Sequence, residues 1–290
     1  MNHDFLGAMQ DVDYVFSKKA YSWSSGVHGS AVEGGSFISK GHDDFFNSPD
    51  CSEIDFLGTI LTGSHVPQVE IFEQKSNITI MAVADMSASL RVSGTVTKLV
   101  EMARFIICIG YSAYKIGDRF GAVGYGDDIS FYFDPRIKRM YAFEIAEWLC
   151  EELPLMGTEA KVLPFVNDYL AAQPSLVFWL SDFHMPDEDI RRFLDVAAAT
   201  HEIVPVVFWD SAEFSRLPRW GMGWIKDPET GAMRMELFTP RRIKALHASF
   251  EARRARLEAL FSEYGISPFI VTDEFEPVDI AEYFFGMRAE

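Results

Sequence analysis

Oxygen-bearing side chains alternate along the pentapeptide Asp85-Met86-Ser87-Ala88-Ser89. The pentapeptide follows an apolar run at residues 78–84, typical of a buried strand, and precedes a stretch with helical periodicity. Carboxylate and hydroxyl oxygens are the ligands that hard cations such as Mg²⁺ and Mn²⁺ prefer, whereas Zn²⁺ prefers nitrogen and sulfur. The spacing therefore predicts a divalent-cation site or, in the simpler interpretation, a turn whose serines cap the following helix.

Two more segments carry oxygen ligands at equivalent places. Thr158 lies in a Gly-Thr connection before a predicted helix, and Asp182 follows a second apolar run at residues 175–181. The carboxyl ends of parallel strands meet at one edge of a sheet, and ligands bind in the crevice there. We therefore predict that three segments form one metal site, with the ligands Asp85, Ser87, Ser89, Thr158 and Asp182.

Predicted strands and helices alternate from residue 77 onward. Strands are predicted at 78–85, 119–125, 129–133, 175–181, 203–208 and 269–271, and helices at 96–116, 138–153, 160–172, 187–200, 240–264 and from 277. A turn at residues 227–231 also indicates a β-hairpin. This alternation predicts an α/β fold with a doubly wound, mostly parallel sheet.

The first 76 residues differ from the rest in composition and hydrophobic pattern. Gly, Ser, His and Asp are frequent there, and helical periodicity is weak. We therefore predict a small β-rich or irregular N-terminal module over residues 1–76, followed by the α/β domain over residues 77–290.

Charge and composition exclude several classes of protein. The 290 residues include 26 Lys and Arg against 43 Asp and Glu, so the net charge of −17 disfavours a nucleic-acid or membrane-surface role. The three cysteines, Cys51, Cys108 and Cys150, lie far apart and favour neither a disulfide framework nor a zinc site. No secretion signal or membrane span is visible in the sequence, so we expect a cytoplasmic protein.

The pentapeptide, the Gly-Thr loop and the strand-end Asp together resemble the metal-ion-dependent adhesion site of von Willebrand factor A domains. The segment Gly117-Asp118-Arg119 with Gly121 and Val123 is similar to a strand entry in the A-domain-like family whose genes neighbour MoxR-type AAA+ ATPases. The segment Glu53-Ile54-Asp55 also resembles that family, and the subgroup suggested is the MxaS type of bacterial methanol-oxidation clusters. Residues 40–46 and Phe56 depart from the family's N-terminal signature.

The resemblance implies a non-enzymatic interaction module. Its bound Mg²⁺ or Mn²⁺ would accept a carboxylate from a partner, and the partners implied are a MoxR-type AAA+ ATPase and a client enzyme, methanol dehydrogenase in the MxaS-type case. Two alternatives remain open: a metal-dependent phosphohydrolase that uses the same strand-end site, and an A-like fold whose site is only structural. No P-loop or nucleophile–base pair is visible, and Arg91 is the nearest basic side chain, which favours the interaction module.

Three other features have simpler interpretations. The glycines between residues 117 and 126 resemble a phosphate loop but straddle a predicted strand, which favours a role in packing. His184 lies close to Asp182, and we expect it to be a surface residue at the rim of the site. The basic stretch at residues 241–260 is interpreted as a solvated helix face that pairs with acidic neighbours rather than as a docking surface.

Overall fold

The computed structural model describes residues 12, 14, 25–33, 39–44, 54–55, 68–91, 97–151, 163–213, 220–226 and 233–289. The chain divides into two compact units, Lys18–Ile78 and a larger unit that joins Met1–Ser17 to Thr79–Glu290. The sequence placed residues 1–17 in the N-terminal module instead. Two contacts explain the difference: Val12 N donates to Ser112 Oγ at 3.0 Å, and the Tyr14 hydroxyl donates to the Asp118 carboxylate.

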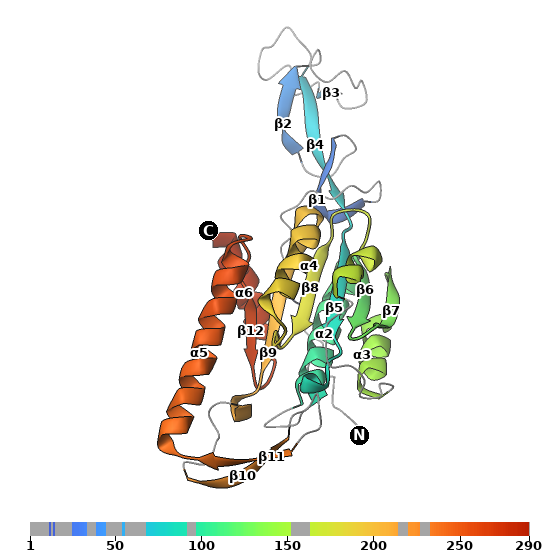
Figure 1. The fold of residues 1–290 in the computed structure, drawn as a ribbon. Helices are drawn as coiled ribbons and strands as arrows, with labels where there is room; N and C mark the ends of the chain where they lie inside the picture. Colours follow the sequence, from blue (N-terminus) through green and yellow to red (C-terminus); the bar gives the residue numbers. More distant parts are fainter. Residues whose placement is uncertain are drawn as a thin grey trace. The chain divides into compact units, whose positions relative to one another are not determined.

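The smaller unit contains an antiparallel sheet in which β4 is central (Figure 1). Its strands are β1 (Ser25–Glu33), β2 (Ser39–Asp44), β3 (Ile54–Asp55) and β4 (Gln68–Ser76). β1, β2 and β3 all pair with β4, and the β1–β4 and β2–β4 ladders contain register shifts.

The larger unit is built on a six-stranded sheet of order β12-β9-β8-β5-β6-β7 (Figure 1). The strands are β5 (Thr79–Asp85), β6 (Arg119–Tyr125), β7 (Ile129–Arg136), β8 (Leu176–Ser181), β9 (Glu202–Trp209) and β12 (Phe269–Thr272). Every neighbouring pair is parallel except β6–β7. The predicted doubly wound, mostly parallel α/β sheet is therefore confirmed.

Helices cover both faces of this sheet (Figure 1). Their bounds are α2 (Lys98–Ile116), α3 (Tyr141–Glu151), α4 (Asp187–Thr200), α5 (Pro240–Ser262) and α6 (Pro277–Ala289), with short 3₁₀ helices η3 (Ala88–Arg91), η4 (Leu163–Tyr169) and η5 (Ser211–Glu213). The predicted hairpin is formed by β10 (Gly221–Lys226) and β11 (Met233–Phe238). Among the described residues, no helix is both long and apolar enough to cross a bilayer.

Two consecutive residues of β8 show how the layers are arranged. Phe178 packs against Phe105 of α2, with ring centroids 5.3 Å apart. Trp179 packs against Phe193 of α4 at 4.6 Å and Phe261 of α5 at 6.5 Å. Successive side chains of a strand point to opposite faces, so α2 lies on one side of the sheet and α4 and α5 lie on the other.

Residues 163–172, the described part of the helix predicted at 160–172, do not form an α-helix. Leu163–Tyr169 form the 3₁₀ helix η4, and residues 152–162 lie outside the described part of the chain. Asn167 Nδ2 donates to the carbonyl oxygen of Pro164 at 3.2 Å. A short polar side chain that bonds to the local backbone competes with α-helical hydrogen bonding, which favours the shorter turn.

Two glycines of β6 are required by packing. A Cβ atom built on Gly121 would lie 2.7 Å from the carbonyl oxygen of Phe133, and one on Gly124 would lie 2.2 Å from the ring of Phe131. Gly117 ends α2 with φ 93°, in the left-handed region that favours glycine. The packing interpretation is therefore confirmed for Gly121 and Gly124, whereas Gly117 is required by the left-handed end of α2.

Gly124→Ala should lower the free energy of unfolding by about 1–3 kcal/mol, because the added methyl group overlaps a buried aromatic ring. Gly286→Ala is the matched control, since its Cβ would meet open space and alanine favours the helix by up to about 1 kcal/mol. Urea unfolding measures both changes. If Gly124→Ala were as stable as Gly286→Ala, the close approach of β6 and β7 would be wrong.

Candidate functional site

The carboxyl ends of β5 and β8 bring two predicted ligand segments together. Asp85 is the last residue of β5, and Ser181 is the last residue of the neighbouring β8. Asp85 Oδ2 accepts a hydrogen bond of 2.6 Å from Ser181 Oγ. Asp182 follows at once, and both carboxylates are only 2% exposed. The sheet therefore places the two acids at one edge.

The pentapeptide turns toward these carboxylates. Ser87 N donates to Asp85 Oδ1 at 2.9 Å, and the hydroxyl oxygens of Ser87 and Ser89 lie 3.0 Å apart. The side chain of Ser89 also lies near Asp182 and acts to lower its pKa. Four of the five predicted ligands thus form one connected group, whereas Thr158 lies outside the described residues.

The serines do not cap helix α2, as the simpler interpretation required. The pentapeptide leads into the 3₁₀ helix η3, where Leu90 N donates to the carbonyl oxygen of Ser87 at 3.3 Å. Helix α2 begins at Lys98 after Thr97, which makes no side-chain capping bond. The hydroxyls of Ser87 and Ser89 instead meet each other and Asp182.

A buried lysine, which the sequence analysis missed, completes the group. Lys98 is 2% exposed, and its Nζ donates to Asp182 Oδ2 at 3.0 Å and to Glu213 Oε1 at 2.7 Å. Glu213 belongs to η5, which follows β9. In the sequence the basic side chain nearest to the pentapeptide is Arg91, whereas the cation at the site belongs to Lys98, the first residue of α2.

The two carboxylates have opposite electrostatic environments. Burial and, to a smaller extent, the negative charge of Asp182 raise the pKa of Asp85 from 3.8 to about 6, although hydrogen bonds from Ser181 and Ser87 act to lower it. Burial also acts to raise the pKa of Asp182, but Lys98 and His184 lower it below its usual value. Asp182 is therefore a stable carboxylate at neutral pH, whereas Asp85 is a carboxylate without a cationic partner among the described residues.

Rigid aromatic neighbours hold this edge in place. Trp209 Nε1 donates to the carbonyl oxygen of Asp182 at 2.9 Å, and Trp179 Nε1 donates to the Tyr125 hydroxyl at 2.8 Å. Phe183 is fully buried and has φ 53°, a left-handed conformation that is uncommon for a bulky residue. Its amide donates to Ser181 Oγ at 2.9 Å. Such strain persists where the surrounding structure imposes it, as it does at many functional sites.

His184 lies at the rim, as the sequence analysis expected of it. Its side chain is 45% exposed, and Nε2 lies 3.7 Å from Glu213 Oε2. Burial acts to lower its pKa, but the bond to Glu213 and the charge of Asp182 raise the pKa above its usual value. His184 therefore contacts the glutamate that holds Lys98 rather than the pentapeptide.

The residues present fit a hard cation. Among the described residues, no three Asp, Glu, His or Cys side chains gather as a metal site of their own. The available donors are instead the Asp85 carboxylate and the hydroxyls of Ser87 and Ser89, a set that suits Mg²⁺ or Mn²⁺. A cation would also neutralise the buried charge of Asp85. Asp182 already has Lys98 as its counter-ion, so it would act on such a cation through a water molecule rather than by direct contact.

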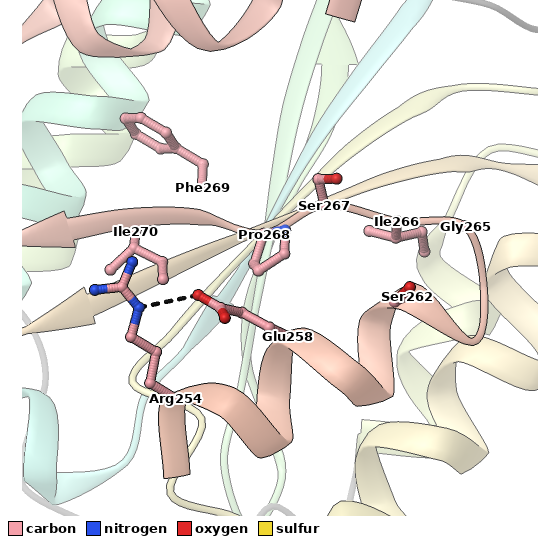
Figure 2. A pocket seen from close by; sticks show the side chains of 9 residues that line it. All are labelled: Arg254, Glu258, Ser262, Gly265, Ile266, Ser267, Pro268, Phe269 and Ile270. Atoms are coloured by element: carbon pink, nitrogen blue, oxygen red, sulfur yellow. Dashed lines mark hydrogen bonds and ion pairs between the residues drawn. The ribbon is translucent and has the colours of Figure 1, made fainter. Parts of the chain in front are cut away.

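A separate groove lies at the amino end of β12 (Figure 2). It has a volume of about 600 Å³ and lies between the C-terminal half of α5 and the segment that enters β12. Arg254 and Glu258 line it and pair with each other at 2.9 Å. The groove lies at the opposite edge of the sheet from Asp85 and contains none of the predicted ligands.

Basic residues of α5 pair within the larger unit. Arg253 Nη1 contacts Asp187 Oδ1 at 3.1 Å, and its Nη2 donates to the carbonyl oxygen of Met185 at 3.0 Å. Arg256 also pairs with Asp187, and Arg254 pairs with Glu258. These contacts confirm, for this half of the stretch, that the basic side chains pair with acidic neighbours.

The chain is similar to a known protein family, to a bacterial relative and to solved structures. A family model described as "Protein of unknown function DUF58" matches residues 52–259. A Paracoccus denitrificans protein named "Uncharacterized protein in moxR 3'region" is 32% identical over 93 residues, which are 32% of this chain and 88% of that protein. The structure of BatB from Bacteroides thetaiotaomicron is 10% identical, with a TM-score of 0.42, over 74% of this chain and 100% of that chain. The SpRpn10 VWA domain is 11% identical, with a TM-score of 0.39, over 71% of this chain and 94% of that chain.

Proposed function

The chain belongs to the DUF58 family, and we propose on this premise that it is a metal-dependent protein-interaction module. In this proposal it works with a MoxR-type AAA+ ATPase in the assembly or activation of a client enzyme, such as methanol dehydrogenase. Asp85, Ser87 and Ser89 would hold Mg²⁺ or Mn²⁺, with Thr158 as a further ligand, and Asp182 would act through water. The metal would supply an open coordination position for a carboxylate of the partner.

One observation carries this proposal: a nearly fully buried carboxylate and two hydroxyls meet at the strand ends. Asp85 has one hydrogen bond to each oxygen but no described basic partner, so a cation is the group that its environment favours. The name of the Paracoccus relative places that protein beside moxR, which supports an ATPase of this type as the partner. The expected cytoplasmic location belongs to the same proposal.

Lys98 gives some support to the phosphohydrolase alternative, because it places a positive charge at the site where the sequence predicts none. Phosphoryl transfer needs a positive group that faces the transferred phosphate. The Lys98 ammonium is 2% exposed and donates to two carboxylates of the protein itself. Lys98 is thus directed toward Asp182 and Glu213 rather than toward solvent, and the interaction module remains the favoured function.

Asp85→Ala should weaken Mg²⁺-dependent binding to the cognate MoxR-type ATPase at least tenfold, because it removes the only charged ligand proposed for the metal. Biolayer interferometry with Mg²⁺ and with EDTA measures this effect. Glu147→Ala is the matched control, since it removes an exposed carboxylate of α3.

Binding that is indifferent to EDTA and to Asp85→Ala would contradict the proposal and leave the site a structural feature. Release of phosphate from phosphoesters by the wild-type protein, dependent on Mg²⁺ and lost in Asp85→Ala, would favour the hydrolase instead.

A further inference from the structure

Lys98 is an unusual residue for the interior of an α/β domain. A lysine is almost never fully buried unless it is paired, and Lys98 has two carboxylate partners on different segments of the chain. Asp182 follows β8, and Glu213 lies in η5 after β9. Both contacts are short, at 3.0 and 2.7 Å. The chain thus builds a cation into the same edge of the sheet that carries the proposed metal ligands.

Asp182 connects this cation to the pentapeptide. Its carboxylate accepts a hydrogen bond from Lys98, the side chain of Ser89 lies near it, and its charge acts on Asp85. A divalent ion held by Asp85 and Ser89 would therefore share the neighbouring Asp182 carboxylate with the ammonium group of Lys98. The ion and the ammonium group both carry positive charge, and like charges repel strongly where water does not screen them. The ion pair also reduces the attraction that Asp182 would otherwise exert on the metal.

We propose that Lys98 is the resident cation of this strand-end site, and that it keeps the site's affinity for a divalent metal low until a partner supplies a carboxylate. The inference rests on the metal site proposed above. A partner carboxylate would add the negative charge that offsets the ammonium and would complete the metal's shell. Metal binding and partner binding would then strengthen each other, as thermodynamic linkage requires.

Titration of the full chain with Mn²⁺ by isothermal calorimetry tests the role of Lys98. Lys98→Met removes the charge, and Lys98→Gln removes it but retains a hydrogen-bond donor for Asp182. Both variants should bind Mn²⁺ at least roughly tenfold more tightly than the wild type. Lys115→Met is the matched control, because it removes a lysine charge from the exposed last turn of the same helix, and it should bind as the wild type does.

A second measurement covers loss of stability in the variants. Without metal, removing Lys98 leaves buried negative charge unbalanced, so both variants should melt at a lower temperature than the wild type. Mn²⁺ should raise their melting temperatures more than that of the wild type, because it replaces the missing cation. Variants that fold only with Mn²⁺ would support the inference, and variants that Mn²⁺ does not recover would overturn it.

The result also separates this inference from the metal site on which it rests. Equal Mn²⁺ affinity in the wild type, Lys98→Gln and Lys98→Met, lost in Asp85→Ala, would overturn the role of Lys98 and leave the metal site in place. If neither the wild type nor any Lys98 variant bound Mn²⁺, the proposed metal site itself would be wrong.

Discussion

Replacing Asp182 with Ala is expected to lower the free energy of unfolding of the larger unit by about 3 kcal/mol. The substitution leaves the Lys98 ammonium buried with Glu213 as its one remaining carboxylate among the described residues. Breaking a buried ion pair from one side typically costs about 3–5 kcal/mol, because the remaining charge is no longer compensated. We expect a loss at the low end of this range, because Glu213 still pairs with Lys98 and its side chain is one-third exposed. Urea unfolding in EDTA, followed by tryptophan fluorescence, measures the loss.

Glu258→Ala is the matched control for Asp182→Ala. Glu258 pairs with Arg254 at 2.9 Å, but both side chains are nearly half exposed. An exposed pair at this helical spacing contributes about 0.3–0.5 kcal/mol. A loss in Asp182→Ala as small as the loss in Glu258→Ala would show that the Lys98 pair is not shielded from water, and it would weaken the case for a resident cation.

The sheet was predictable because its central strands are buried on both faces. β5 and β8 have apolar runs that end in an acid or in serine followed by an acid, and the observed strands begin within one residue of the predicted positions. The convergence of Asp85 and Asp182 follows from the parallel pairing of these neighbours. The continuous apolar runs of these strands agree with their central place in the sheet, since a strand buried on both faces requires apolar residues throughout.

Lys98 was missed although its position carried a signal. It precedes Met102, Phe105 and Ile109 on the buried stripe of α2, so helical spacing places it on the inner face. A lysine at a helix start is ordinarily read as solvated, and the sequence offers no sign of its partners. Glu213 lies 115 residues away, and only the tertiary fold brings this glutamate beside β8.

Helix α5 shows a second limit of sequence patterns. The sequence predicts an apolar face formed by Ile243, Leu246, Phe250, Leu257 and Leu260. Of these, Leu257 and Leu260 are buried, together with Phe261. The first three are only partly buried. Periodicity indicates which side of a helix is apolar, but it does not indicate how far along the helix the sheet extends to cover that side.

Stability of the metal-free protein should also depend on the ionisation of Asp85. Burial, followed by the charge of Asp182, raises the pKa of Asp85 from 3.8 to about 6 in the folded state. The folded state thus binds the Asp85 proton more tightly than the unfolded state does. This contribution to stability is fully present below pH 3.8 and is lost as the pH rises through about 6. The loss amounts to up to about 3 kcal/mol.

Asp85→Asn isolates this effect from other titrating groups. The pKa of His184 is raised and that of Glu213 is lowered, and both groups remain in the variant, so their contributions largely cancel in the difference from the wild type. We expect Asp85→Asn to gain stability relative to the wild type by up to about 3 kcal/mol between pH 4.5 and pH 7.5 in EDTA. Urea unfolding at several pH values measures the gain.

Asp168→Asn serves as the control for this pH series, because Asp168 is an exposed carboxylate of η4. Its stability should follow the wild type at every pH. Mg²⁺ at a concentration above its dissociation constant should narrow the difference between the wild type and Asp85→Asn at pH 7.5, since only the wild type retains the carboxylate that the proposed metal requires. A stability difference between the wild type and Asp85→Asn that does not change with pH would show that Asp85 is not held at a raised pKa. The buried carboxylate would then already have a counter-ion, and no divalent metal would be needed at the strand ends.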